Sequence, residues 1–180
     1  RLATGRRINQ VADDPAGYTI SKRLEARIVG LSTAFDNVGT AKNVLSIAEG
    51  GLMNIQDILI TMKEKVTQAK SDTMGDNERD AIKAELNELT SEINDIVTET
   101  EFNGVALLDG SYTTKSYQTG EGVSNTLTYS LSQNFTAASI SVNTTDVGES
   151  VDSATNAGNA LTKVNTALTT VADQLQGLGA

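Results

Sequence analysis

A stripe of apolar side chains that recurs every three or four residues dominates the first part of this chain. Such spacing places all members on one side of an α-helix. At about 1.5 Å per residue, a helix over residues 15–70 would be on the order of 80 Å long, so it needs partner helices to cover its apolar side. The stripe comprises Ile20, Leu24, Ile28, Leu31, Phe35, Val38, Ala41, Leu45, Ala48, Leu52, Ile55, Leu59, Met62 and Val66.

The start of this helix is marked by Asp14 followed by Pro15. An aspartate carboxylate accepts hydrogen bonds from the free backbone N–H groups of a first turn, where proline lacks the donor that would be unused. Asp13 and Asp14 can also be interpreted as a pair of metal ligands, but no other acidic residue stands at ligand spacing, so we favour the helix start. Because glycine weakens a helix, the pair at Gly50 and Gly51 makes a bend or break an alternative to one continuous helix.

A turn and a second helix follow the long first helix. Residues 71–77 are rich in turn-forming types, and a loop this short returns the next helix antiparallel to the first. The second helix is expected over about 77–100. Its apolar stripe is Ile82, Leu86, Leu89, Ile93 and Ile96.

The last segment, residues 149–180, carries the most regular stripe. Its apolar residues step by three and four over more than three heptads, with Leu168 in the middle, which is typical of a helix that packs against another helix. The members are Ala154, Ala157, Leu161, Val164, Leu168, Val171, Leu175 and Leu178. The helical patterns together predict a mainly α fold, a long antiparallel helical bundle or coiled-coil rod.

Residues 102–148 break the helical pattern and predict a small β-hairpin region. Asn103-Gly104 and Asp109-Gly110 are turn signals around a short apolar run. Residues 126–132 and 138–143 alternate between apolar and polar types, as half-buried strands do. We therefore expect one rod domain built from helices over 1–101, this β region, and a last helix over 149–180.

Composition excludes several classes of function. The formal net charge is −9, which disfavours nucleic acid and anionic membranes as partners because both attract clustered Lys and Arg. The chain has no Cys and no His, so thiol nucleophiles, imidazole bases and zinc–thiolate sites are absent. No phosphate-binding loop or nucleophile elbow is present. We expect no enzyme activity, no metal and no cofactor.

The order of several motifs resembles that of the bacterial flagellins. The opening segment 6–17 (RRINQVADDPAG), which includes Asp13, Asp14, Pro15 and Gly17, is similar to the start of that family. Segments 20–24, 28–31 and 47–52 continue the resemblance in register. Phe102, Asn103 and Gly104 lie in a segment similar to the one that follows the second flagellin helix, and residues 160–180 resemble the start of the C-terminal helix.

The resemblance implies a structural subunit of the bacterial flagellar filament, which is secreted by the flagellar export apparatus and self-assembles outside the cell for motility. It implies copies of the chain itself as partners, together with an export chaperone and a cap for the full-length protein. The chain would be a rod-domain fragment lacking both terminal inner-domain helices. A hook-associated junction protein, which shares the Asp-Asp-Pro opening and the long helices, is the alternative.

One departure from the family concerns a vertebrate innate receptor that senses flagellin. The helix motif read by that receptor aligns here with residues 60–65. Lys63 and Glu64 keep its chemistry and Glu85 matches an acidic position on the second helix, but Thr61 replaces an Arg and Lys65 replaces a Leu. Thr lacks the bidentate donors of Arg, and a Lys in place of an apolar anchor must be desolvated. We expect weak recognition by this receptor.

Overall fold

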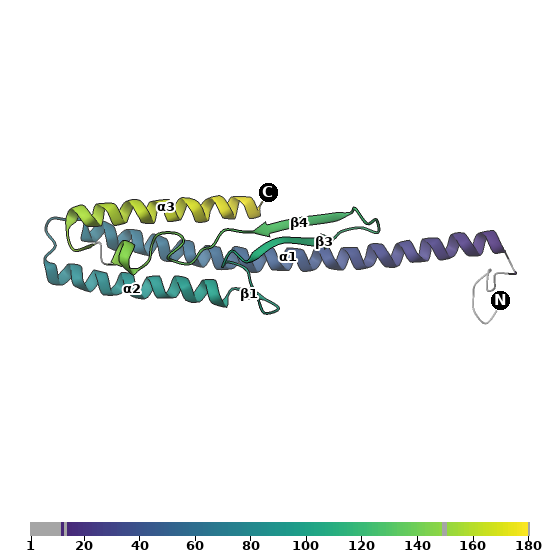
Figure 1. Cartoon of the computed structure of the whole chain (residues 1–180), viewed down its shortest axis with the longest axis horizontal. Helices are drawn as coiled ribbons and strands as arrows, with labels where there is room; N and C mark the ends of the chain where they lie inside the picture. Colours follow the sequence, from purple (N-terminus) through teal and green to yellow (C-terminus); the bar gives the residue numbers. More distant parts are fainter. Residues whose placement is uncertain (1–11, 13, 149–150, 180) are drawn as a thin grey trace. The chain divides into compact units, whose positions relative to one another are not determined.

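The computed structural model describes residue 12, residues 14–148 and residues 151–179. Within these residues the fold is mainly α, as the sequence predicts (Figure 1). In chain order the elements are α1 (Pro15–Ala69), α2 (Asp76–Glu99), β1 (Glu101–Phe102), β2 (Val105–Ala106), β3 (Tyr112–Gln118), β4 (Thr126–Leu131), the π-helical turn η1 (Thr144–Gly148) and α3 (Ala154–Leu178).

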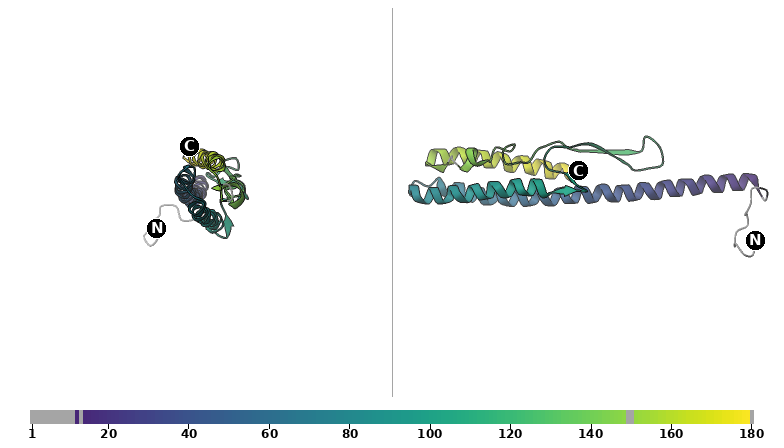
Figure 2. Two further views of the ribbon diagram at one scale, coloured as in Figure 1. Left: turned by 90° about the vertical axis from the view of Figure 1, so that its left-hand side faces the viewer. Right: turned by 60° about the horizontal axis from the view of Figure 1, so that its bottom comes forward.

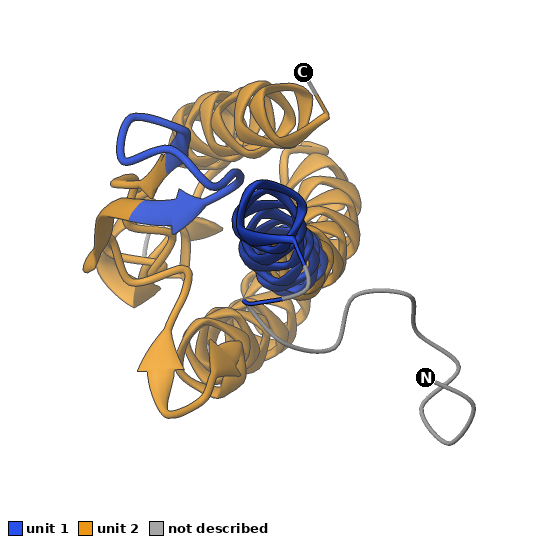
Figure 3. Ribbon diagram, turned by 90° about the vertical axis from the view of Figure 1, so that its right-hand side faces the viewer, with its two compact units in different colours: residues 1–42, 116–128 blue, residues 43–115, 129–180 orange. Residues whose placement is uncertain are grey.

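The chain divides into two compact units (Figure 3). Unit 1 comprises residues 1–42 and 116–128, and unit 2 comprises residues 43–115 and 129–180. Helix α1 therefore contributes its first part to unit 1 and its last part to unit 2. The extended hydrophobic core lies in unit 2, since every buried residue of that cluster falls between residues 44 and 171.

The two parts of α1 differ in how the predicted stripe is used. From Val44 onward the stripe is buried, through Leu52, Leu59 and Val66. The expectation that the whole stripe is covered is wrong for the first part, because the described residues place no element over it. Its exposed members are Ile20, Leu24, Ile28, Leu31, Phe35 and Val38.

Gly50 and Gly51 do not interrupt α1, which is continuous from Pro15 to Ala69. Gly51 is buried, and a Cβ at this position would lie 2.6 Å from Thr100 Oγ1 and 2.9 Å from Leu108 Cδ1. The glycine therefore allows a close approach of the segment after α2, whereas Gly50 has open space around it.

A buried arginine closes the turn between α1 and α2. Arg79 is only 7% exposed, and its guanidinium donates hydrogen bonds to the carbonyl oxygens of Ala69 and Ser71, the latter at 2.9 Å. The last carbonyls of a helix have no partner within the helix, so Arg79 supplies one to the end of α1. Within unit 2, α2 and α3 both lie alongside residues 43–69 of α1 and run opposite to it (Figures 1 and 2).

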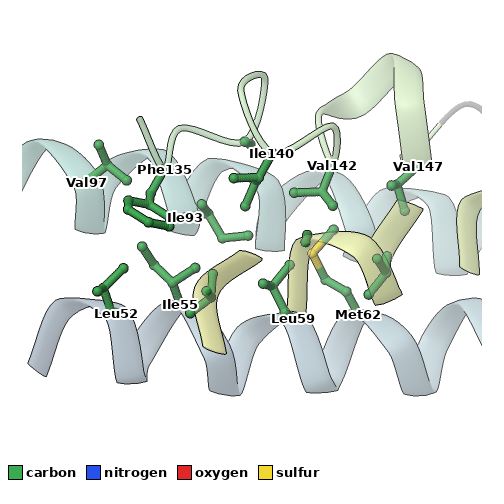
Figure 4. Close-up of a cluster of buried hydrophobic side chains, with 14 of the residues drawn as sticks. Leu52, Ile55, Leu59, Met62, Ile93, Val97, Phe135, Ile140, Val142 and Val147 are labelled. Atoms are coloured by element: carbon green, nitrogen blue, oxygen red, sulfur yellow. The ribbon is translucent and has the colours of Figure 1, made fainter. Parts of the chain in front are cut away.

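The core of unit 2 is built from three sources (Figure 4). Leu52, Ile55, Leu59 and Met62 project from α1 toward Ile93 and Val97 of α2. The irregular segment before η1 completes this layer with Phe135, Ile140 and Val142, and Val147 of η1 adds to it. Its apolar side chains fill the space that helices alone would leave.

The segment 138–143 is not the predicted strand. Its alternation does bury Ile140 and Val142, but its backbone bonds locally, with Val142 N–H donating to the Ala137 carbonyl at 2.8 Å. Side chains of α2 satisfy further backbone groups. The Thr90 hydroxyl donates to the Val142 carbonyl at 3.1 Å, and Ala137 N–H donates to Asn94 Oδ1 at 3.0 Å.

The other β predictions hold. Strands β1 and β2 form a hairpin in which Phe102 pairs with Val105. Its turn residues, Asn103 at φ 53° and Gly104 at φ 75°, have the positive φ values of a type I′ turn. Strand β4, which pairs with β3, occupies the first predicted strand, and Gly110 also has a positive φ of 81°.

Helix α3 begins at Ser153, whose hydroxyl accepts from Asn156 N–H at 3.2 Å. Its most buried face is turned relative to the predicted stripe. Ala157, Ala160, Val164, Ala167 and Val171 are buried, while Leu161, Leu168, Leu175 and Leu178 are half-buried at the edge of the core. The expectation that Leu168 lies at the centre of the buried stripe is therefore wrong, because small alanines occupy the close contact.

Candidate functional site

The opening motif acts as a helix start in the described residues. Asp14 Oδ1 accepts a hydrogen bond from Gly17 N–H at 3.0 Å, and Pro15 is the first residue of α1. Asp14 is thereby engaged as an N-cap. Asp13 and residues 6–11 of the motif lie outside the described residues.

The Phe102-Asn103-Gly104 motif anchors the exit from α2. Phe102 packs against the core, while the following Leu107 and Leu108 are fully buried. Leu107 N–H donates to the Thr100 carbonyl at 3.0 Å, which fixes the hairpin directly behind α2. The motif therefore sets the direction in which the chain leaves the helix.

Two members of the candidate receptor-recognition face form an ion pair. Lys65 Nζ of α1 lies 2.5 Å from Glu85 Oε2 of α2, with both side chains partly exposed. The hydrogen bond to Glu85, followed by its negative charge, raises the pKa of Lys65 above the ordinary value of 10.5. Lys65 is therefore tied to α2 where the family motif has an apolar Leu.

The other three members are exposed, but they do not share one side of α1. Successive residues of an α-helix are about 100° apart, so Thr61, Glu64 and Lys65 lie on one side and Lys63 lies about 160° away from Lys65. The Thr61 hydroxyl donates to the Asp57 carbonyl at 3.1 Å, within its own helix. The face thus presents a short, self-satisfied Thr side chain at the position of the family's Arg.

Sequence patterns gave no indication of a set of contacts within unit 1. Arg27 Nε lies 2.8 Å from Glu121 Oε1, and Asn37 Nδ2 donates to the Gln118 carbonyl at 3.1 Å. These contacts fix segment 118–123 to α1. The partners are more than 80 residues apart in sequence, and no local spacing rule relates them.

Titratable groups offer little for catalysis. Among the described residues, no group of three or more Asp or Glu side chains could hold a metal ion. Burial raises the pKa of Tyr129, and hydrogen bonds from Ser111 lower the pKa of Asp109; both residues have structural partners. None of the helices in the described part of the chain combines the length and apolar character that crossing a bilayer requires.

Long packed helices, a short hairpin behind α2 and side chains engaged in structural contacts define a helical structural protein. The model of the bacterial flagellin N-terminal helical region matches residues 1–113. The chain therefore belongs to the bacterial flagellin family, which confirms the resemblance noted in its motifs.

Curated relatives agree with this assignment. The flagellar filament 41 kDa core protein of Borreliella burgdorferi is 35% identical over 121 residues, covering 67% of this chain and 36% of that protein. The B-type flagellin of Pseudomonas aeruginosa is 37% identical over 140 residues, covering 78% of this chain and 28% of that protein. The chain thus spans about a third of the length of the curated relatives it matches.

Solved structures share the fold. Bacillus cereus flagellin superposes with a TM-score of 0.66 at 22% identity, covering 83% of this chain and 82% of that one. A Vibrio parahaemolyticus protein described as flagellar hook-associated gives a TM-score of 0.78 at 17% identity, covering 94% and 88%. At these identities the likeness concerns the fold alone.

Proposed function

We propose that this chain is part of a structural subunit of the bacterial flagellar filament, which assembles with copies of itself outside the cell. Membership of the flagellin family supports this role. The observation that carries it is the row of large apolar side chains left exposed along α1, from Ile20 to Val38. Contiguous exposed apolar surface marks contact with other protein, which is what an assembling subunit requires.

Within that subunit the chain would form the rod domain, with helices over 1–101, the β region over 102–148 and the last helix over 149–180. The full-length protein would also meet an export chaperone and a filament cap during secretion by the flagellar export apparatus. A structural role involves no catalytic group, which agrees with the absence of Cys and His.

A hook-associated junction protein is the second candidate, because the Vibrio parahaemolyticus structure has the same fold. The location of the protein on the flagellum separates the two roles. Gold-labelled antibodies raised against this chain should decorate purified flagella along their whole length. Labelling confined to one short band next to the hook would contradict the filament role and support the junction role.

We further propose that the vertebrate flagellin-sensing receptor recognises this chain only weakly. Thr61 and the Lys65–Glu85 ion pair support this, since interface hot spots are typically Arg or large apolar side chains worth about 2 kcal/mol or more. The double variant Thr61→Arg with Lys65→Leu should activate reporter cells more strongly than the parent. Lys63→Leu, on another side of α1, is the matched control. Equal and strong responses from parent and double variant would refute the proposal.

A further inference from the structure

Unit 1 contains an open groove. Gly30, Thr33, Ala34 and Asn37 of α1 form one wall and segment 118–123 forms the other, around a hollow of about 490 Å³. Small residues keep the helix wall low, and Val123, which is 95% exposed, adds an apolar side chain. The contacts from Arg27 to Glu121 and from Asn37 to Gln118 hold the two walls together.

The groove continues into a basic end. Arg23 and Arg27 lie seven and three residues before Gly30, and this spacing places them on the same side of α1 as the groove wall. Both arginines are exposed. A ligand of this surface would therefore combine apolar side chains with a negative charge at one end.

The outward side of α1 in unit 2 carries a ridge with those properties. Met53 and Ile60 are 53% and 52% exposed, although their neighbours Leu52 and Leu59 are fully buried. They stand seven residues apart, about 10 Å along the helix. Glu49, Asp57 and Glu64 are exposed on the same side, so acidic residues lie between and beyond the two apolar ones.

We propose that this ridge of one copy docks into the unit 1 groove of a second copy. Met53 and Ile60 match the seven-residue length of the groove wall from Gly30 to Asn37. An acidic residue then falls beside the arginines in either helix direction, Glu49 in a parallel contact and Glu64 in an antiparallel one. The inference rests on the proposed self-assembly and names the surfaces that perform it.

Charge and symmetry both favour a second copy as the occupant. A chain of net charge −9 repels its copies in general, so a stable contact must bring opposite charges together. The ridge and the groove are different surfaces of one chain. Such a heterologous contact leaves a free groove on one partner and a free ridge on the other, and it can repeat into a filament.

Cysteine cross-linking tests the contact directly, because the natural chain has no Cys. Asp57 is mid-ridge and Thr33 is mid-groove, so they oppose each other in either direction. Copies carrying Asp57→Cys are mixed with differently tagged copies carrying Thr33→Cys and then oxidised. Mixed dimers should form about tenfold faster than in a control mixture of Asp57→Cys with Glu92→Cys on α2, because docking raises the effective thiol concentration.

Further variants test the chemistry of the contact. Ile60→Ser in the Asp57→Cys copy should slow the mixed cross-link, whereas Ile47→Ser, an exposed apolar residue on another side of α1, should not. Arg23→Glu in the Thr33→Cys copy should also slow it. Glu49→Lys or Glu64→Lys in the other copy should restore the rate, and the one that succeeds gives the helix direction. Unchanged thermal melts show that the variants remain folded.

Three results would overturn the inference: mixed dimers no faster than the control, dimers of a single variant as fast as the mixed ones, or no effect of Ile60→Ser. The filament role is tested separately by antibody labelling. Labelling along the filament together with failed cross-linking would reject these surfaces and leave the proposed function intact. Specific cross-linking with labelling only at the hook would do the reverse.

Discussion

Helix α1 offers a comparison between two segments with the same apolar periodicity. Over residues 44–69 the stripe is buried by α2, α3 and the segment before η1. Over residues 20–38 the same periodicity leaves large side chains exposed, including Phe35 at 78%. Periodicity thus determines the side of the helix on which apolar residues lie, whereas coverage depends on what the rest of the assembly places there.

The largest predicted difference between the segments comes from removing one leucine in each. Leu59→Ala should lower the free energy of unfolding by about 2–5 kcal/mol, because it empties a fully buried site. Leu24→Ala, at a site that is 52% exposed, should change it by about 0.5 kcal/mol or less. Urea denaturation followed by circular dichroism measures both. Equal losses would mean that residues 20–38 are covered in solution.

Two glycines sharpen the comparison with smaller effects. Gly51→Ala should destabilise the protein by about 1–3 kcal/mol, because its Cβ would overlap Thr100 and Leu108 in the core. Gly39→Ala, in the exposed segment, meets nothing within 4 Å and should stabilise the helix by up to about 1 kcal/mol. Thermal melts should therefore shift in opposite directions. A rise in melting temperature for Gly51→Ala would contradict the close approach at that residue.

How much of this could be read from the sequence differs by element. The cap at Asp14, the turn at Asn103-Gly104 and the positions of the helices follow from local chemistry. Coverage of the α1 stripe does not, because it depends on contacts distant in sequence. Heptad counting also misjudged Leu168, since it favours large residues, whereas the closest helix contact in α3 is made by Ala160 and Ala167.

The predicted strand 138–143 failed for a related reason. Alternation identified the buried Ile140 and Val142, but a strand also needs a neighbouring strand for its backbone. Thr90 and Asn94 of α2 supply those hydrogen bonds here. At the candidate site, the family motif identified Lys65 and Glu85 as separate positions, and only the packing of α2 against α1 shows them as a pair.

The smallest predicted difference concerns ion pairs. Lys65→Met should remove a pH-dependent contribution to stability, whereas Arg27→Met should remove none below pH 12, where arginine stays charged. The folded-state pKa of Lys65 is raised above 10.5, so its contribution is complete below that pH and is lost as the pH rises through the raised value. Urea midpoints between about pH 9 and 11.5 measure this. A parent and Lys65→Met with the same dependence would refute it.

Amide hydrogen exchange along α1 tests the central claim, that one helix has a covered and an uncovered segment, most directly. Amides of residues 44–69 lie in the core segment and should exchange only through global unfolding, with protection equal to the unfolding free energy. Amides of residues 15–38 should exchange through local opening, orders of magnitude faster. Uniform protection from Pro15 to Ala69 would contradict the account.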